Sequence, residues 1–158
     1  MKAIHIDQIA EEERQSPKGV YHLFQKNISL ALGGQKDVGP WGGGHPFDLA
    51  RVRVPAGRKN WPVHRHAAQW ELYYVLAGSG RYFDGTSWSD ICAGHALIAA
   101  PGELHQMENT GGTDLIYLVI ADMPMADHVN YPDTGLTFAK PARKFFKETA
   151  VNYYDGHE

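Results

Sequence analysis

Four side chains able to bind a metal ion lie in two stretches of the sequence: His64, His66 and Glu71 in the first, and His105 in the second. Residues two apart on an extended chain point to the same side, so the first two imidazoles share a face. A turn over residues 67–69 can bring the Glu71 carboxylate back toward that pair. His105 follows 34 residues after Glu71. The spacing indicates one candidate site with three imidazoles and one carboxylate.

The chemistry of this donor set is that of a transition-metal site. Neutral imidazoles and a carboxylate suit iron, manganese, nickel, cobalt, copper or zinc, whereas calcium prefers oxygen ligands. Four ligands on an octahedral ion leave two positions open, as in a catalytic site and unlike a closed structural one. The residues alone leave an alternative open. The chain holds nine histidines, and an isolated His-x-His pair is as readily solvated or hydrogen-bonded.

Alternation of apolar and polar side chains predicts short β-strands around these residues. Ala50, Val52 and Val54 alternate with Leu49 and two arginines, a period of two that is typical of a half-buried strand. Further strands are expected at 70–77, 81–83, 86–88, 96–100, 106–109 and 115–121. About seven short strands separated by tight turns indicate an all-β sandwich or barrel.

The length of 158 residues is that of a single domain with an ordinary hydrophobic core. We expect an N-terminal arm over 1–46, a barrel core over 47–123 and a C-terminal tail over 124–158. The aromatic residues of the tail need a surface to cover, either on the barrel or on a partner subunit. The arm holds strand-like pieces such as Ser29 to Leu32. Because association commonly hides exposed strand edges, the sequence predicts a homodimer.

Composition excludes several classes of protein. The formal net charge is −3 and the isoelectric point about 6.3, so no nucleic-acid partner is expected. No apolar run approaches the roughly 18 residues of a membrane span, and no apolar secretory signal begins the chain. We therefore expect a cytoplasmic protein without membrane contact. Cys92 is the single cysteine, which excludes an intramolecular disulfide and a thiolate zinc cluster.

Both stretches around the candidate ligands resemble the two signature motifs of the cupin superfamily. The residues that carry the resemblance are Gly57, His64, His66, Glu71 and Gly78 in the first motif, and Gly94, Pro101, Gly102, His105 and Asn109 in the second. The departures are small. One extra residue separates Gly57 from His64, Ala100 occupies a position that is commonly proline, and His95 stands where aspartate is common. None of these departures falls on a presumed ligand.

The resemblance implies a double-stranded β-helix, the jelly-roll barrel of the cupins, here with an N-terminal arm and a C-terminal tail. It further implies one divalent transition metal inside the mouth of the barrel. Its ligands would be His64, His66, Glu71 and His105, which makes a mononuclear site of three histidines and one glutamate. The motifs carry little information about the substrate.

Alternation along the strands also predicts which side chains line the substrate pocket. Tyr73 and Val75 share a face with Glu71, and Met107 shares a face with His105, so we expect these three residues in the pocket. The inward faces of the core strands offer no Lys or Arg. The pocket is therefore expected to be apolar and aromatic, with few charges besides the metal ligands.

Three functions fit these observations. The first is a metal-dependent enzyme of dioxygenase or isomerase type that acts on a small oxygen-bearing organic molecule. The second is a cupin that binds or senses a small molecule without turnover. The third is a sugar-phosphate isomerase, which needs inward Lys or Arg to neutralise the phosphate. An acid/base group near the metal would distinguish catalysis from binding. His45, His95 and Glu103 are candidates, and none is assigned a catalytic role.

Overall fold

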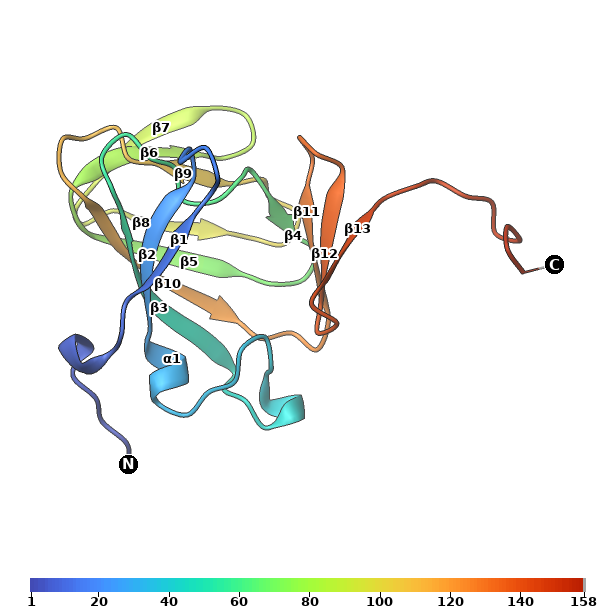
Figure 1. Ribbon diagram of the computed structural model, residues 1–158, viewed down its shortest axis with the longest axis horizontal. Coiled ribbons are helices and arrows are strands. Elements are labelled where there is room, and N and C mark those ends of the chain that lie inside the picture. The colour runs from blue at the N-terminus through green and yellow to red at the C-terminus, as the bar shows by residue number, and fades with distance from the viewer. Residues whose placement is uncertain (158) are drawn as a thin grey trace.

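The computed structural model describes residues 1–157, which form mainly antiparallel β-strands (Figure 1). The strands are β1 (Glu12–Gln15), β2 (His22–Asn27), β3 (Phe47–Val54), β4 (Arg65–His66), β5 (Glu71–Ala77), β6 (Ser79–Phe83), β7 (Trp88–Cys92), β8 (Ala96–Ala99), β9 (Gln106–Glu108), β10 (Leu115–Asp122), β11 (Asp127–Tyr131), β12 (Leu136–Lys140) and β13 (Lys144–Lys147). Short helical segments are η1 (Ile6–Gln8), α1 (Ile28–Ala31) and η2 (Pro40–Gly42). No helix within residues 1–157 has the length and apolar character needed to cross a membrane.

The strands are arranged in sheets of six, four and three strands. Their orders are β1-β2-β3-β10-β5-β8, β13-β12-β11-β4 and β7-β6-β9. Strands distant in the sequence are neighbours in space. The longest pairing joins β3 to β10, from Val54 opposite Leu115 to Phe47 opposite Asp122. These antiparallel crossovers form a jelly-roll barrel, so the predicted fold class is confirmed.

The N-terminal arm is part of the largest sheet. Strands β1 and β2 form a hairpin, and β2 pairs with β3. The expectation of a strand at Ser29 to Leu32 is wrong, because α1 covers most of that segment. Ser29 Oγ accepts a hydrogen bond of 2.7 Å from the Leu49 backbone N–H. The Ser29 side chain thus replaces a backbone acceptor for the Leu49 N–H, just beyond the point where β2 stops pairing with β3.

The core lies inside the barrel, on the face predicted by alternation. Its fully buried cluster consists of Leu23, Val52, Val54, Tyr73, Val75, Ile91, Met107, Leu115 and Tyr117. The opposite face of the large sheet is also apolar but stays exposed. Leu72 faces both Ile98 of β8 and Ile120 of β10 across the strands, and each of these side chains is more than one-third exposed. Apolar residues on both faces explain the long apolar runs of the sequence.

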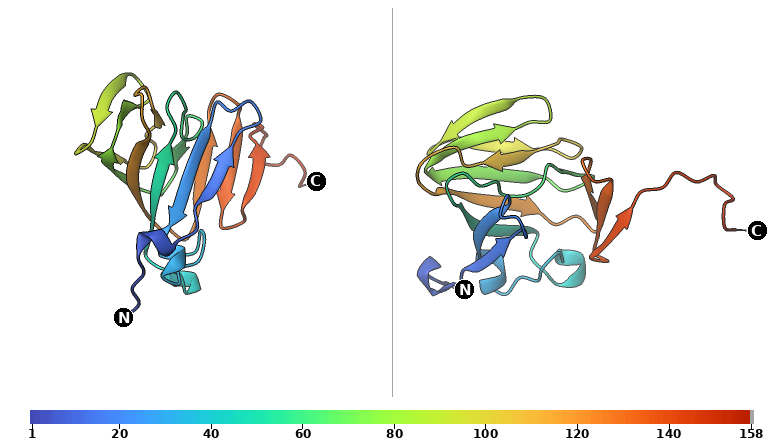
Figure 2. Two further views of the ribbon diagram at one scale, coloured as in Figure 1. Left: turned by 60° about the vertical axis from the view of Figure 1, so that its left-hand side comes forward. Right: turned by 45° about the horizontal axis from the view of Figure 1, so that its top comes forward.

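The C-terminal segment closes one side of the barrel mouth. Strand β11 pairs with β4, and β12 and β13 continue the same sheet (Figure 2). Beyond Glu148 the described chain runs away from the barrel (Figure 1). Tyr153 and Tyr154 in that stretch are 84% and 67% exposed. Within this chain, the aromatic residues that pack on the barrel are therefore those of β11 to β13.

Candidate metal centre

Backbone pairing brings the two halves of the site together. His64 and His105 form an isolated antiparallel bridge. The N–H of His105 donates to the His64 carbonyl at 2.9 Å, and the N–H of His64 donates to the His105 carbonyl at 3.3 Å. Their imidazole centroids lie 4.3 Å apart. The two histidines, which are 41 positions apart in the sequence, are thus brought together by backbone pairing itself, independently of any ion.

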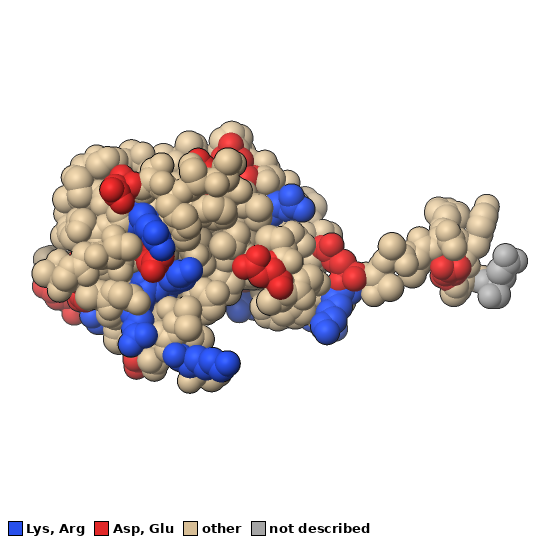
Figure 3. All heavy atoms as spheres, turned by 90° about the horizontal axis from the view of Figure 1, so that it is seen from above, with Lys and Arg blue, Asp and Glu red and all other residues tan. Residues whose placement is uncertain are grey.

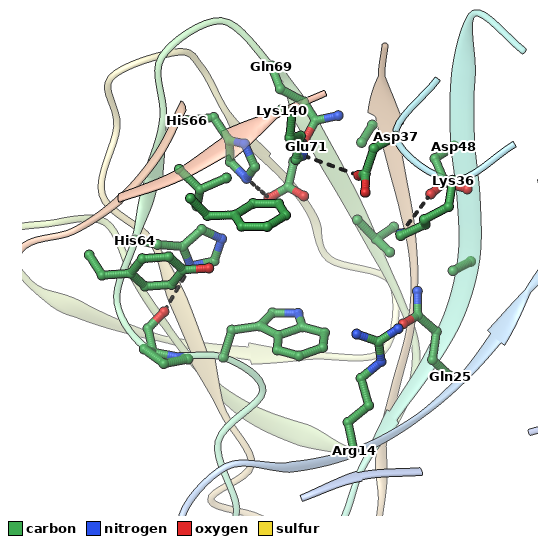
Figure 4. Close-up of a pocket in the computed structure, with 18 of the residues that line it drawn as sticks. Arg14, Gln25, Lys36, Asp37, Asp48, His64, His66, Gln69, Glu71 and Lys140 are labelled. Carbon is green, nitrogen blue, oxygen red and sulfur yellow. Dashed lines mark hydrogen bonds and ion pairs between the residues drawn. The ribbon is translucent and has the colours of Figure 1, made fainter. Parts of the chain in front are cut away.

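The other two presumed ligands complete one compact cluster. His66 ends β4 and Glu71 begins β5. One nitrogen or oxygen of each of the four side chains lies within 4.8 Å of the others, and the three imidazoles are buried. Figure 4 shows His64, His66 and Glu71 converging at one side of a cavity. The structure therefore brings together the four residues that the motifs single out.

Each imidazole is held from behind through its Nδ1 atom. The acceptors are the Pro62 carbonyl for His64 at 2.8 Å, the Asp127 carboxylate for His66 at 2.6 Å, and the Glu103 carbonyl for His105 at 3.0 Å. A proton on Nδ1 leaves the Nε2 lone pair available. Such partners commonly fix the tautomer of a metal-binding histidine. The three rings are therefore oriented with Nε2 toward a common centre.

The Glu71 carboxylate is oriented by two donors. Its Oε2 accepts hydrogen bonds from the Tyr73 hydroxyl at 2.6 Å and from His105 Nε2 at 2.9 Å. Burial alone would raise the pKa of Glu71, but the His105 hydrogen bond and the nearby imidazoles hold that pKa well below its usual range. Burial, followed by the charge of Glu71, raises the pKa of the Tyr73 phenol. Glu71 is thus an anion beside a neutral phenol.

The histidines differ in their affinity for protons. Burial, followed by the charge of His105, lowers the pKa of His64 to about 3. Burial also opposes a charge on His105, but the hydrogen bond and charge of Glu71 raise the pKa of His105 above its ordinary value. Both nitrogens of the His105 ring face acceptors, which is the arrangement of an imidazolium. Its Nε2 proton must leave before that nitrogen can bind a metal.

The geometry and chemistry of the cluster fit a divalent transition metal. An ion with bonds of about 2.0–2.2 Å places opposite ligand atoms up to about 4.4 Å apart. The observed spread of 4.8 Å closes to that value with small side-chain rotations. Three oriented imidazole nitrogens and one carboxylate are ligands of intermediate hardness. His64, His66, Glu71 and His105 could therefore hold such an ion.

The cluster opens onto a cavity of about 580 Å³. Apolar and aromatic side chains form much of its wall: Ala50, Val52, Trp61, Tyr73, Tyr117, Val119, Val129, Tyr131, Phe138 and Phe145. Tyr73 was expected in the pocket, and it lines this cavity. Val75 and Met107 do not line the cavity but belong to the core cluster, at 0% and 1% exposure. Their faces were assigned correctly, but both lie too deep in the barrel to reach the cavity.

The expectation of few charges in the cavity besides the metal ligands is wrong, although much of the wall is apolar and aromatic as expected. Arg14, Lys36, Lys140 and Arg143 contribute to its wall, together with Asp37 and Asp48. Figure 4 shows Arg14, Lys36 and Lys140 around the cavity, and Figure 3 shows basic and acidic side chains interspersed on one face. The four cations come from the terminal segments and a loop, whereas Asp48 lies on β3. The expectation about charges in the cavity considered only the core strands, and the inward faces of those strands indeed carry no Lys or Arg.

Two side chains missed by sequence reasoning complete the site. Asp127 is 3% exposed and bonds to His66. Tyr131 stacks on His64, with ring centroids 5.8 Å apart. Both lie on β11, in the segment assigned only to a tail. The aromatic content of that segment was a signal for packing, whereas nothing in the spacing of Asp127 connects it to a histidine 61 positions earlier.

The acid/base candidates from the sequence lie outside the cavity wall. His95 contacts Cys92, with Nδ1 to Sγ at 3.5 Å. Glu103 accepts a hydrogen bond from the Ala100 backbone at 2.8 Å and supports the turn before His105. His45 packs near Phe47, with ring centroids 6.5 Å apart. Their places indicate structural roles, and the hydroxyl groups nearest the ligands are those of tyrosines.

Comparison with known proteins agrees with the fold. Residues 50–121 match the family model of the cupin domain. The chain resembles the crystal structure of a sugar phosphate isomerase of the cupin superfamily from Silicibacter pomeroyi, with a TM-score of 0.74 and 20% identity over 98% of this chain and 94% of that one. Residues 50–121, a little under half of the chain, therefore match a cupin domain, and the described chain has the fold of a cupin barrel.

Relatives by sequence match only part of the chain. An oxalate-binding protein from Thermotoga maritima is 38% identical over 72 residues, which are 46% of this chain and 59% of that protein. An uncharacterised protein from Methanocaldococcus jannaschii is 30% identical over 76 residues, or 48% of this chain and 60% of that one. A crystal structure of a predicted oxalate decarboxylase from Thermotoga maritima has a TM-score of 0.62 and 23% identity, covering 78% of this chain and all of that one.

Proposed function

We propose that this protein is a metal-dependent enzyme that acts on a small organic molecule through the oxygen atoms of that molecule. Its cofactor would be one divalent transition metal held by His64, His66, Glu71 and His105. The reaction would be of dioxygenase or isomerase type. The observation that carries the proposal is the convergence of four oriented ligands within 4.8 Å of one another, three of which (His64, His66 and Glu71) line a cavity of about 580 Å³.

A bound divalent ion would polarise a substrate oxygen and stabilise negative charge developing on it. The residues of the chain supply the remaining requirements. Trp61, Phe138 and Phe145 line the cavity with aromatic surface, which excludes water around the ligand. The Tyr131 hydroxyl belongs to the same wall, and burial raises the pKa of that phenol. At neutral pH it therefore holds its proton and can donate a hydrogen bond to the substrate.

The name of the Thermotoga maritima relative is compatible with this proposal. That relative is an oxalate-binding protein, and oxalate is a small anion that chelates metals through oxygen. The match of this chain to the cupin-domain family model, over residues 50–121, includes all four presumed ligands. Binding without turnover is the competing function, because the same cavity can hold a ligand that does not react.

Metal content and oxalate binding test the proposal together. We expect about one transition-metal ion per chain by elemental analysis, and metal-dependent oxalate binding by calorimetry. The Glu71→Ala variant should lose both, whereas His128→Ala, at an exposed histidine, should retain both. Oxygen consumption and product analysis with oxalate and a panel of hydroxy and oxo acids then separate enzyme from binding protein. Absence of metal-dependent binding in the wild type would refute the proposal.

A sugar-phosphate isomerase is a second candidate, because the cavity wall contains cations that the sequence did not reveal. Lys36 pairs with Asp48 at 3.3 Å, and Lys140 lies 3.8 Å from Asp37. Arg143 also pairs with Asp37. Cations partly neutralised in this way can still attract a phosphate. Proton NMR can monitor whether the metal-loaded protein opens the ring of a sugar phosphate or interconverts its aldose and ketose forms. Such a reaction would distinguish this candidate from oxidative chemistry.

We also propose that the protein works as a cytoplasmic homodimer. The exposed apolar face formed by Leu72, Ile98 and Ile120 supports this assembly, since contiguous apolar surface of this kind marks interaction sites. A second copy of the chain offers the same face, as a twofold interface requires. A single cysteine is compatible with a reducing compartment.

A further inference from the structure

Two polar side chains face the cavity from the N-terminal hairpin. Arg14 of β1 is opposite Leu23 of β2, and Glu12 is opposite Gln25. Arg14 and Gln25 are therefore diagonal neighbours on one face of the hairpin. Both belong to the cavity wall, and Figure 4 shows them across the cavity from His64 and His66. The hairpin thus places two hydrogen-bond donors far from the metal centre.

Gln25 lines the cavity from β2, and the residue is 7% exposed. Its amide carries two N–H donors and a carbonyl acceptor. The buried side-chain atoms without a hydrogen-bond partner in residues 1–157 are Asn27 Oδ1 and Asp48 Oδ1, so the Gln25 amide is not one of them and stays accessible from the cavity. A ligand in the cavity is therefore positioned to accept a hydrogen bond from this amide.

Arg14 differs from the other cations of the cavity wall in its ion pairs. Besides Glu71, the wall has the carboxylates of Asp37 and Asp48, which are paired with Lys36, Lys140 and Arg143. Within residues 1–157 the ion-pair partner of Arg14 is Glu12, at 3.5 Å and with a side chain 52% exposed. Such an exposed pair contributes little free energy. The Arg14 guanidinium can therefore exchange this contact for an anion inside the cavity.

Trp61 fixes the position of the guanidinium. The Arg14 guanidinium carbon lies 5.6 Å from the centroid of the Trp61 ring, within the range of a cation–π contact. The same ring lines the cavity, and Figure 4 shows Arg14 on the side of that cavity opposite His64 and His66. Trp61 thus holds Arg14 at one end of a flat apolar surface, along which the body of a ligand can lie.

We propose that Arg14 and Gln25 form a second subsite, which binds an oxyanion at the far end of a ligand whose near end binds the metal. The ligand class is a small organic acid with a metal-binding oxygen at one end and a carboxylate or phosphate at the other. Arg matches both oxyanions through paired N–H donors. This inference rests on the proposed function and assigns the substrate class of the same cavity.

Two matched pairs of probes test the subsite on the metal-loaded protein by calorimetry. Lactate and malate share an α-hydroxy acid end, and only malate has a second carboxylate. Glycerate and phosphoglycerate share the same end, and only phosphoglycerate has a terminal phosphate. We expect the wild type to bind at least one doubly charged probe more tightly than its singly charged partner. The pair that shows the gain identifies the oxyanion as carboxylate or phosphate.

In the Arg14→Gln variant, the affinity for the doubly charged probe should fall roughly ten- to hundredfold, because a hydrogen bond to a charged group contributes that much to binding. The singly charged probe should bind as in the wild type. Gln25→Leu should weaken the same doubly charged probe by a smaller factor. Arg58→Gln removes an equal charge from an exposed position outside the cavity wall and should change nothing. Equal effects of Arg14→Gln on both members of a pair, or no gain from the second anion, would overturn the subsite.

The same measurements separate this inference from the proposed function. Metal-dependent lactate binding without an Arg14 effect refutes the subsite alone. If no probe binds in a metal-dependent way, the proposed function fails, and inorganic phosphate with the metal-free protein then tests the subsite. Weaker phosphate binding by Arg14→Gln than by wild type would support it, and equal binding would refute it. Matching thermal unfolding of the two proteins excludes a folding defect.

Discussion

The Asp127 carboxylate accepts a hydrogen bond of 2.6 Å from Nδ1 of His66. The other Asp127 oxygen accepts from the backbone N–H groups of Ala68 and Gln69, at 2.9 and 3.4 Å. Burial would raise the pKa of Asp127, but the His66 hydrogen bond holds it well below its usual range. Asp127 lies outside the matched residues 50–121, so the C-terminal strands supply a charged partner to the site.

Asp127→Asn should weaken metal binding by roughly ten- to hundredfold, as loss of an outer partner of a ligand commonly does. The amide keeps an oxygen for the backbone donors but no longer stabilises the His66 ring as strongly as a carboxylate. Competition with a chromophoric chelator measures the affinity, and the absorption of the cobalt-loaded protein reports the coordination. Asp133→Asn, at an exposed position of the turn after β11, is the control. Unchanged affinity in Asp127→Asn would show that this contact only supports the fold.

Metal binding should release the proton that His105 holds. Burial opposes a charge on His105, but the hydrogen bond of its Nε2 to Glu71 raises its pKa, and a metal must displace the Nε2 proton. Affinity should therefore fall as the pH drops through the raised pKa of His105. Calorimetry in buffers of different ionisation enthalpy counts the released proton. A heat of binding independent of buffer would contradict this assignment.

The metal-free protein should lose stability in acid because of His64. Its pKa falls from 6.5 in the unfolded chain to about 3 in the fold, so between these values only the unfolded chain binds the proton. The stability due to neutral His64 is therefore present above pH 6.5 and is lost as the pH falls toward 3. His105 has the opposite sign: its contribution is present below the unfolded pKa and is lost as the pH rises through the folded one. Urea unfolding of wild type and His64→Gln between pH 7 and 4 measures the difference, which should shrink in acid.

Met107→Ala should act on stability and leave the cavity unchanged. The side chain is 1% exposed within the core cluster, so truncation leaves a void and should cost about 2–5 kcal/mol of unfolding free energy. Urea unfolding measures this loss, and chelator competition at low temperature measures the metal affinity of the folded variant. Leu115→Ala, from the same cluster, should behave alike. If Met107→Ala changed ligand binding without loss of stability, Met107 would be a residue of the pocket and not of the core.

Leu72→Asp should convert the proposed dimer to a monomer of 17.6 kDa. Leu72 is opposite both Ile98 and Ile120 on the exposed sheet face, so a charge there would be desolvated in an interface on this face. Sedimentation velocity at micromolar concentration measures the mass. Val151→Asp, in the exposed C-terminal stretch, should leave the assembly intact. A wild type that sediments as a monomer would refute the dimer itself.

The sequence alone predicted the strands of the barrel core and the four side chains that cluster there. Alternation places His64 and His66 on one side of an extended segment irrespective of the rest of the fold. The Pro101-Gly102 turn before His105 is equally local, since Gly102 has a φ of 89°, a conformation that favours glycine. Periods of two and turn chemistry depend on neighbouring residues only, and such neighbours are visible in a sequence.

Only the tertiary structure decided what surrounds those ligands. Alternation gives the face of a side chain but not its depth, and each step of two residues moves about 6.6 Å along a strand. Tyr73 therefore reaches the cavity, whereas Val75, one step further, lies in the core. Asp127 and Arg14 reach the site because β11 pairs with β4 and β1 extends the large sheet. Which strands become neighbours depends on the free energy of the whole barrel, and no local spacing encodes it.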